Sequence, residues 1–345
     1  MRGCVARSLA RTYGKAQLRR DRLDDLQSGV TEPLVTVGIP TFNRTEGLAR
    51  TLASIQAQTY RHIEIIVSDN ASPDPAVRAT VDDFASRDER VTYYRHPENI
   101  GAMRNFSSLL PRARGEFFMW AADDDRWEPF FVERCVERLK ADPRLVVCQM
   151  EAQYEVDGKM LFPFFFEGAP FKAFSSRSPV ERVKHLLRHV YGNLVYGVFR
   201  REALFHNGKP ITEWIGATLN EIPMQILLAF RGDIRVIPEI GFYKTAPRTV
   251  CEQARWEQVG GRLPNWRGWQ NYIRDCRSLH RYHKMVMHEN FAAIDALGLE
   301  SRTTGQLRKF AAYCLFRHEL LLALRWKPAG PGLSHPIASH VAPQN

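Results

Sequence analysis

The sequence has few cysteines and no long hydrophobic run. Its six cysteines are scattered over 345 residues, without a CxxC pair or histidines at the spacing of a zinc site. This pattern excludes a disulfide framework and predicts a reducing, cytoplasmic compartment. No run of about 18 apolar residues is available to span a bilayer, and the N-terminus lacks the apolar stretch of a secretory signal.

Glycine-rich phosphate loops are also missing. Neither GxGxxG nor GxxxxGKS or GxxxxGKT occurs, which removes the main support for dinucleotide and P-loop nucleotide binding. Hydrophobic residues nevertheless make up 44% of the chain and charged residues 25%. This balance is typical of a globular protein with a sizeable core.

The basic residues exceed the acidic ones by ten, and the excess lies at the two ends of the chain. Residues 1–30 carry seven basic and three acidic groups, residues 31–249 carry 28 of each, and residues 250–345 carry 13 and seven. A nucleic-acid enzyme would place a basic stripe on its working domain, so the neutral middle predicts no nucleic-acid partner. Basic flanks suit attachment to an anionic membrane surface, which here would be the inner face of the plasma membrane. Charged segments of this kind are also common as surfaces that only face solvent.

From Leu34 onward, short apolar runs alternate with longer segments of helical period. This alternation predicts an α/β fold in which helices flank a mostly parallel sheet. Strands are expected at 35–40, 63–68, 91–94, 116–120 and 145–149. Helices are expected at 45–58 and 129–141, with two more around 77–84 and 103–110.

After residue 150 the regular alternation stops. The later patterns predict helices at 179–190 and 220–231, a buried strand at 193–199, a hairpin from 234–237 and 240–244, and a helix at 304–325. The apolar face of that last helix suits a membrane surface, packing on the rest of the chain, or a dimer. The expected division is a basic extension at 1–30, an α/β catalytic domain at 31–249, a helical region at 250–326 and a disordered tail at 327–345.

Polar residues follow the predicted strands at the points where they end. They include Thr41, Asn43, Arg44, Asp69, Asn99, Arg104 and the triplet Asp123-Asp124-Asp125. Ligands of open α/β sheets bind beyond the carboxyl ends of the strands. Three consecutive carboxylates repel one another unless a cation or arginines compensate, and oxygen ligands suit Mg²⁺ or Mn²⁺. The sequence therefore predicts a metal-assisted site at this edge.

An ordered set of motifs between residues 35 and 244 resembles one family. The set comprises Ile39-Pro-Thr-Phe-Asn-Arg44, Gln58-Thr-Tyr60, Ser68-Asp-Asn-Ala-Ser72, Asn99-Ile-Gly101 with Asn105, Ala113-Arg-Gly-Glu116, and the aspartate triplet with Pro129. In this order and spacing it resembles the family-two inverting glycosyltransferases, which use nucleotide sugars. The resemblance implies a GT-A (Rossmann-like) mostly parallel sheet flanked by helices, with a C-terminal helical extension.

The resemblance also implies roles for individual residues. Donor-binding roles are implied for Pro40, Thr41, Asn43, Arg44, Asp69, Asn99, Arg104 and Asp123. Thr41 and Asn43 would line the nucleoside pocket, and Asp69 would accept a hydrogen bond from a base N–H, which favours UDP or dTDP. Asp124 would be the principal ligand of Mg²⁺ or Mn²⁺, supported by Asp125. The family commonly has an acid two positions before Asp124, where this chain has Ala122, so the division of roles within the triplet stays open.

Inversion at an anomeric carbon needs a base that deprotonates the acceptor hydroxyl. The segment Asn220-Glu221-Ile-Pro223 is similar to the acidic base motif of the family and opens a predicted helix. A carboxylate in the first turn of a helix is held ionised by the helix dipole, so Glu221 is the candidate base. The family usually has Glu-Asp here, and Glu213 is an alternative.

These features predict a metal-dependent inverting glycosyltransferase that moves a sugar from a nucleoside diphosphate to a hydroxyl of a glycan or lipid-linked acceptor. Cell-surface polysaccharide synthesis is the expected setting. A nucleotidyltransferase would need a basic, glycine-rich triphosphate loop, which the sequence lacks. A non-catalytic glycan- or nucleotide-binding subunit is the remaining alternative, and the retention of Asp69, the triplet and Glu221 argues against it.

Overall fold

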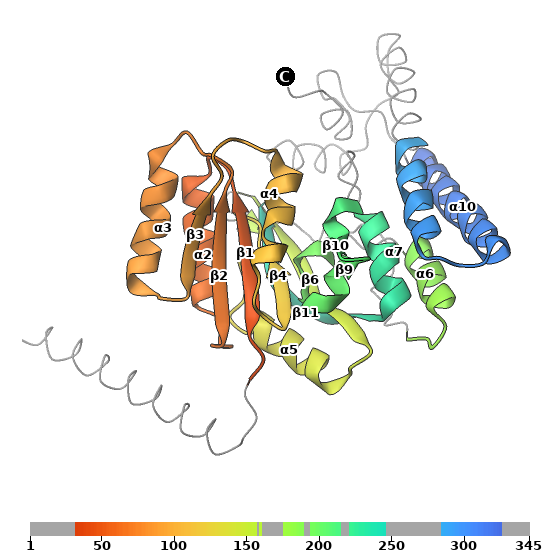
Figure 1. The fold of residues 1–345 in the computed structure, drawn as a ribbon, viewed down its shortest axis with the longest axis horizontal. Coiled ribbons are helices and arrows are strands. Elements are labelled where there is room, and N and C mark those ends of the chain that lie inside the picture. Colours follow the sequence, from red (N-terminus) through yellow and green to blue (C-terminus); the bar gives the residue numbers. More distant parts are fainter. Residues whose placement is uncertain are drawn as a thin grey trace, which may run out of the picture.

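A central sheet with helices around it forms the frame of the protein (Figure 1). The computed structural model describes residues 32–156, 159–160, 175–189, 194–214, 221–245 and 284–325. The predicted basic extension, the tail and Asn220 lie outside the described residues.

The first four predicted strands form the parallel part of the sheet, in the order β3-β2-β1-β4. They are β1 (Val35–Thr41), β2 (Ile63–Asp69), β3 (Val91–Arg95) and β4 (Phe117–Trp120). Every residue of β2 and β4 is buried, as expected for parallel strands covered on both faces. The register pairs Thr41 with Asp69, so the ends of β1 and β2 meet at one edge.

The helices of this half begin where the sequence patterns predict them. They are α2 (Thr45–Gln56), α3 (Pro75–Arg87), α4 (Ala102–Ser108) and α5 (Phe131–Ala141), with a short 3-10 turn η1 (Leu110–Arg112) after α4. Asp74 caps α3 by accepting a hydrogen bond from the Ala76 amide, and Pro75 fits the first position because its missing N–H needs no partner there. In α2 the buried residues Leu48, Leu52 and Ile55 lie four and three positions apart and share one face.

The second half completes the sheet with strands of both directions. They are β5 (Arg126–Trp127), β6 (Leu145–Val156), β7 (Lys159–Met160), β8 (Val198–Arg200) and β11 (Asp233–Thr245), with a separate two-stranded pair of β9 (Phe205–His206) and β10 (Lys209–Pro210). Strand β8 lies antiparallel between β4 and β6. Strands β6 and β11 are parallel to each other, and β5 pairs antiparallel with β11.

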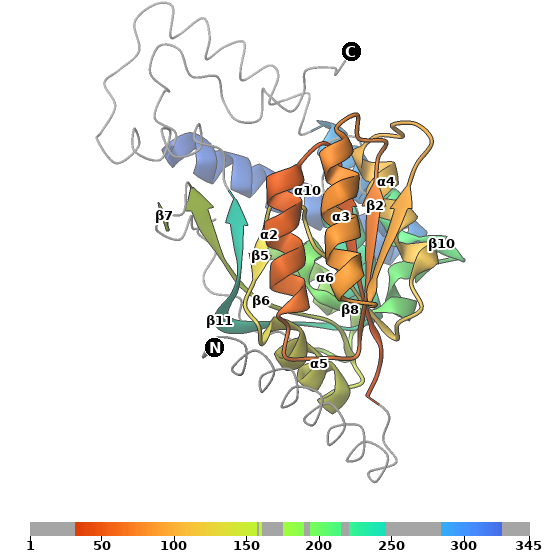
Figure 2. The same ribbon diagram turned by 90° about the vertical axis from the view of Figure 1, so that its left-hand side faces the viewer.

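The predicted hairpin at 234–244 is wrong, because β11 is one continuous strand beside β6 (Figure 2). The segment that resembles a turn, Pro238 to Gly241, instead produces register shifts on either side of Ile240. A Cβ on Gly241 would lie 2.4 Å from Met150 Cβ, so glycine allows the two strands to approach closely. The glycine therefore marks an irregularity inside a strand rather than a reversal.

The predicted strand at 193–199 is only partly correct. Leu194–Tyr196 forms the 3-10 helix η2, and the strand begins at Val198. Leu194 and Val195 are buried, and a short apolar run is compatible with either a strand or a buried turn. Two further 3-10 segments follow, η3 (Arg201–Leu204) and η4 (Ile211–Trp214).

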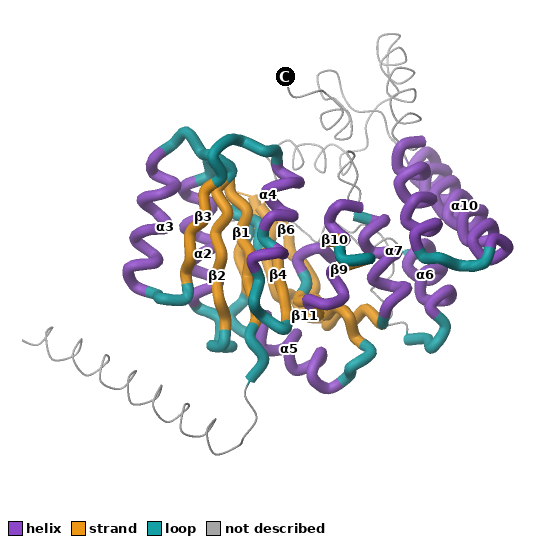
Figure 3. Tube along the Cα trace, in the orientation of Figure 1, coloured by secondary structure: helices purple, strands orange, loops and turns teal. Residues whose placement is uncertain are grey.

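The remaining helices pack together on the side of the molecule opposite α3 (Figure 3). They are α6 (Pro179–Arg188), α7 (Ile222–Arg231), a helix at 284–296 and α10 (Ser301–Arg325). Leu307 and Ala311 of α10 are buried in the same core as residues of α6 and α7, and the Arg188 guanidinium lies 5.0 Å from the Phe310 ring centroid. Of the three alternatives for the apolar face of this helix, the described residues therefore favour packing on the rest of the chain.

None of the helices in the described part of the chain is both long enough and apolar enough to cross a membrane.

Candidate active site

The carboxyl ends of β1, β2 and β4 meet at one edge of the sheet and carry most of the predicted site residues. The Asn70 amide donates to the Thr41 carbonyl at 3.0 Å, and the Ala121 amide donates to the Gly38 carbonyl at 2.9 Å. These bonds tie the loops that follow the three strands to one another. Phe42, in the first of these loops, is 42% exposed.

Asp123 faces back into the β1 loop. Its Oδ2 accepts a hydrogen bond from the Thr41 hydroxyl at 2.8 Å, and its Oδ1 lies 3.2 Å from the Arg44 guanidinium. Burial raises the pKa of the Asp123 carboxyl, and the Thr41 and Arg44 contacts offset this only in part. The structure thus brings together three of the predicted donor-binding residues.

Asp124 is the accessible member of the triplet. Its side chain is 30% exposed and pairs with Arg44, whose own side chain is 55% exposed. Burial alone would lower the pKa of Arg44, but the charges of Asp124 and Asp123 outweigh it and raise that pKa. A cationic group therefore already lies where two carboxylates of the triplet converge.

Asp125 points away from the other two, into the protein. Its Oδ2 lies 3.0 Å from Lys244 Nζ, and its Oδ1 accepts a hydrogen bond of 3.0 Å from the Thr245 amide. The Asp125 side chain is only 1% exposed. Burial raises its pKa, and the Lys244 charge acts in the opposite direction.

The triplet loop lies directly against the start of α2. The Thr51 hydroxyl bonds to the carbonyls of Ala122 and Asp125 at 2.9 and 2.7 Å. A Cβ on Gly47 would lie 2.5 Å from the Asp123 carbonyl oxygen, so only glycine lets the helix approach the loop this closely. These contacts fix the backbone of the triplet.

The described residues contain no group of three or more acidic, histidine or cysteine side chains placed to hold a metal ion. Within the triplet, only the Asp124 carboxylate is accessible to solvent, whereas Asp123 and Asp125 are buried. One carboxylate with substrate phosphates is a common way to bind Mg²⁺, so Asp124 fits this metal. Both Asp125 oxygens are engaged by Lys244 and Thr245.

Glu221 lies at the start of α7 and is partly buried. It immediately precedes Ile222, and its Oε2 atom is buried without a hydrogen-bond partner among the described residues. Burial raises the pKa of Glu221 to about 7, although Lys244, the Val195 amide and Gln225 each lower it. Desolvation therefore opposes the ionised form that a position at a helix start is expected to favour.

Lys244 and Tyr196 connect the candidate base to the triplet, and both were missed in the sequence. Lys244 Nζ lies 4.0 Å from the Tyr196 ring centroid as well as 3.0 Å from Asp125. Burial raises the pKa of Tyr196 to about 12, and the charges of Asp125 and Glu221 add to this effect. Only the position of Lys244 at the end of an apolar strand could have drawn attention to it.

Asp69 is fully engaged by its neighbours. Its Oδ1 accepts hydrogen bonds from the Ser72 amide and hydroxyl at 2.9 and 2.5 Å. Its Oδ2 accepts from the Tyr93 hydroxyl at 2.6 Å and from Arg95 at 2.8 Å. Burial would raise the pKa of Asp69, but these bonds and the Arg95 charge outweigh it and lower that pKa.

Of the other predicted donor residues, Pro40, Asn43 and Asn99 lie at the same edge as this carboxylate. The backbone N–H of Asn43, a residue with a φ of 57°, donates to Ser72 Oγ at 2.8 Å. Asn99 Oδ1 accepts from Asn70 Nδ2 at 2.7 Å. Pro40 pairs with Ser68 in the sheet, and Arg104 is exposed on α4.

Two solved structures of Staphylococcus aureus TarS have a similar fold. The structure in complex with UDP-GlcNAc matches with a TM-score of 0.55 and 14% identity, over 85% of this chain and 76% of that chain. The structure in complex with UDP matches with a TM-score of 0.54 and 16% identity, over 85% of this chain and 75% of that chain. The mixed, mostly parallel sheet flanked by helices is the GT-A fold, and the C-terminal helical extension is present.

Residues 36–188 match the family model described as glycosyl transferase family 2. This stretch, which is less than half of the chain, is therefore similar to glycosyltransferase family 2.

Named relatives agree with this assignment. The chain is 33% identical over 135 residues to a Bacillus subtilis protein named as the glycosyltransferase EpsH, over 37% of each chain. It is 36% identical over 94 residues to the Campylobacter jejuni GalNAc(5)-diNAcBac-PP-undecaprenol beta-1,3-glucosyltransferase, over 27% of this chain and 30% of that enzyme. The chain thus spans about a third of the length of these relatives.

Proposed function

We propose that the protein is a metal-dependent inverting glycosyltransferase that transfers a sugar from a nucleoside diphosphate to a hydroxyl of a glycan or lipid-linked acceptor. The observation that carries this proposal is the position of Lys244, which pairs with Asp125 of the triplet at 3.0 Å and whose charge also acts on Glu221. It links a buried carboxyl, whose pKa is about 7, to the predicted donor site. A general base works best when its pKa lies near the operating pH.

The donor in this proposal is UDP- or dTDP-linked. The TarS structures contain UDP and UDP-GlcNAc, which supports a pyrimidine nucleotide at the ends of β1 and β2. Because all four hydrogen bonds to Asp69 are made within the protein, a base N–H would reach this carboxylate by displacing Arg95. The Arg95 side chain is 44% exposed and is the contact that can move at least cost.

Asp124 would hold Mg²⁺ or Mn²⁺ in this proposal, with donor phosphate oxygens completing the coordination. When bound, the cation would stabilise the negative charge that develops on the departing diphosphate. Arg44, already paired with Asp124 and Asp123, is placed to add positive charge at the same point. Asp125 would support the site by holding Lys244 rather than by touching the donor.

Glu221 would take the proton of the acceptor hydroxyl on its carboxylate. The acceptor oxygen then forms a bond to the anomeric carbon as the bond to the diphosphate breaks on the opposite face, which inverts the configuration. Lys244 stabilises the ionised form of Glu221, because its charge lowers the pKa of this carboxyl. Without it, burial would leave the base protonated over more of the neutral pH range.

The setting we propose is polysaccharide synthesis at the cytoplasmic face of a membrane. Two partial matches are named for biosynthesis: Escherichia coli WcaA for colanic acid, 27% identical over 48% of this chain, and Bacillus subtilis TuaG for teichuronic acid, 30% identical over 31% of this chain. Attachment would depend on the basic flanks of the chain, since Leu307 and Ala311 of α10 are buried in the core that α6 and α7 share.

The test is a turnover screen of the purified chain against UDP-, dTDP- and GDP-sugars, with and without Mn²⁺ or Mg²⁺. We expect release of the nucleoside diphosphate that requires the metal and is lost in Asp124→Ala. The Glu221→Gln variant should bind the donor normally and lose transfer, whereas Glu213→Gln, at an exposed position, should keep it. Loss in Glu213→Gln alone would move the base to Glu213, and no response to any nucleotide sugar would favour a non-catalytic binding subunit.

A further inference from the structure

A second polar cavity lies at the opposite edge of the sheet from the candidate active site. It has a volume of about 540 Å³ and is lined where β6 and β11 begin and where the antiparallel β8 ends. These are the amino ends of the parallel strands, whereas the aspartate triplet follows the carboxyl end of β4. The cavity is therefore separate from the predicted donor site.

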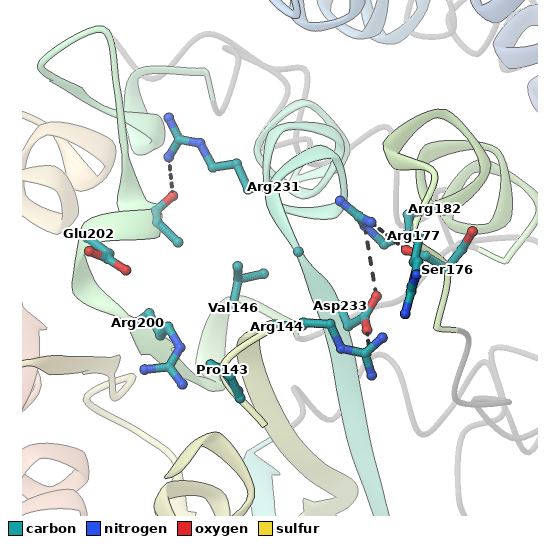
Figure 4. Close-up of a pocket in the computed structure, with 12 residues that line it drawn as sticks. Pro143, Arg144, Val146, Ser176, Arg177, Arg182, Arg200, Glu202, Arg231 and Asp233 are labelled. Carbon is teal, nitrogen blue, oxygen red and sulfur yellow. Dashed lines mark hydrogen bonds and ion pairs between the residues drawn. The ribbon is translucent and has the colours of Figure 1, made fainter. Parts of the chain in front are cut away.

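Five arginines line this cavity (Figure 4). They are Arg144, Arg177, Arg182, Arg200 and Arg231. In Figure 4, two of them, Arg200 and Arg231, lie on one side of Val146, and the other three lie on the opposite side. The arginines come from four separate parts of the chain, so the tertiary fold gathers this charge.

Three of these guanidinium groups bind neutral partners. Arg182 donates to the carbonyls of Ala229 and Phe230, both at 2.7 Å, and Arg200 donates to the Leu145 carbonyl at 2.8 Å. Arg231 donates to the Ala203 carbonyl at 2.5 Å. Carbonyls orient the guanidinium groups without cancelling their charge. Burial lowers the pKa of Arg182 and of Arg231, which is the effect of positive charge held away from water.

The cavity also contains two carboxylates, and they do not balance the arginines. Asp233 is 3% exposed; its Oδ2 accepts from the Ser175 hydroxyl at 2.7 Å and lies 3.7 Å from Arg144. Its Oδ1 lies 3.9 Å from Arg182. Glu202 is exposed at the rim. Outside the lining, Asp142 pairs with Arg144 at 3.2 Å and Glu116 lies 3.9 Å from Arg200. Among the described residues, Arg177 and Arg231 have no carboxylate at ion-pair distance, so these two guanidinium groups carry the positive charge that is left over.

We propose that this cavity binds a phosphate or diphosphate group. Arginine is suited to such a group because its planar fork presents parallel N–H donors to two oxygens at once. Arginines on opposite sides of a cavity match a tetrahedral group whose oxygens point in several directions, better than a planar carboxylate. The exposed Arg177 can close on it directly, and Arg144, whose side chain is 57% exposed, can do so by leaving its ion pair with Asp142. The proposal does not depend on the transfer reaction.

The experiment is calorimetric titration of the full chain with inorganic pyrophosphate and inorganic phosphate at constant ionic strength. The Arg144→Gln/Arg177→Gln variant should bind pyrophosphate at least about tenfold more weakly than the unchanged protein, because it loses two charge-assisted contacts. The matched control, Arg50→Gln/Arg302→Gln, removes two exposed arginines elsewhere and should bind as before. Binding at the donor site would be the same in all three proteins.

Sedimentation with vesicles of phosphatidic acid or phosphatidylglycerol distinguishes a lipid headgroup from a free anion as the source of the phosphate group. If the two-arginine cavity variant loses vesicle binding and the control does not, a lipid headgroup is a ligand. If it loses only pyrophosphate or phosphate binding, the ligand is a free anion. Unchanged binding of both probes in the cavity variant, or an equal loss in the control, overturns the proposal. The single variant Arg177→Gln repeats the test if the double variant proves unstable by circular dichroism.

Discussion

Glu221 is the residue on which the proposed chemistry depends most. Its pKa of about 7 results from burial, opposed by Lys244, Gln225 and the Val195 amide. The base must be ionised to accept a proton, so we expect the transfer rate to rise with pH through about 7. Glu221→Gln should lower kcat by roughly 10²–10⁴-fold and abolish this rise. A pH profile of kcat for both proteins checks this; an unchanged profile in the variant would show that another group is the base.

The raised pKa of Glu221 also affects stability. Between its ordinary value of 4.5 and about 7, the folded state holds this proton more tightly than the unfolded state. Stability contributed by this group is therefore present below pH 4.5 and falls as the pH rises to about 7. At pH 8, Glu221→Gln should be more stable than the unchanged protein, by at most about 2–3 kcal/mol. Urea unfolding at pH 5 and pH 8 measures this, and an equal difference at both values contradicts it.

Lys244 is the residue that couples the triplet to the base. In Lys244→Met the buried Asp125 carboxylate loses its partner, so we expect a loss of about 3 kcal/mol in the free energy of unfolding. The pKa of Glu221 should rise further, which moves the pH profile of transfer to higher pH. Lys244→Arg should restore much of the free energy of unfolding and much of the original pH profile. Lys140→Met, at an exposed position, is the control. If the pH profile of Lys244→Met kept the midpoint of the unchanged protein, Lys244 would have no effect on the base.

At the scale of elements, the contact between α2 and the triplet loop allows a sharp test. Gly47→Ala places a Cβ 2.5 Å from the Asp123 carbonyl oxygen, and neither backbone can yield easily. We expect a destabilisation of about 1–3 kcal/mol and weaker donor binding. Gly305→Ala in α10 meets no atom within 4 Å and should stabilise the protein by about 0.5–1 kcal/mol. Thermal unfolding compares the stability of the two variants directly. Equal changes in both would argue against the close approach of α2 to the triplet loop.

At the scale of the whole molecule, the C-terminal helix is part of the core. Leu307 is fully buried, so Leu307→Ala should cost about 2–5 kcal/mol of unfolding free energy. Tyr313, on the same helix, is 60% exposed, and Tyr313→Ala should change stability by less than about 0.5 kcal/mol. Urea unfolding checks both. A neutral Leu307→Ala would mean that this face is free in solution and available to another surface.

Much of the first half of the fold could be predicted from the sequence because its signals are local. Strand and helix periods are set within a few residues, and the polar ends of β1, β2 and β4 follow directly from where the apolar runs stop. The predicted hairpin failed because a proline and a glycine inside β11 mark an irregularity within a strand, where Gly241 lies close to Met150 on another strand. No local pattern contains that neighbour.

The sequence by itself determined the family motifs, the α/β order and the set of residues at the strand ends. Tertiary structure alone decided how each side chain is used: Asp125 is turned toward Lys244, 119 positions later in the chain, while Asp124 stays accessible. It also set the pKa of Glu221, because desolvation depends on every element packed around a group rather than on its sequence neighbours. Charge and burial at a site are sums over distant parts of the chain, and only the folded molecule brings those parts together.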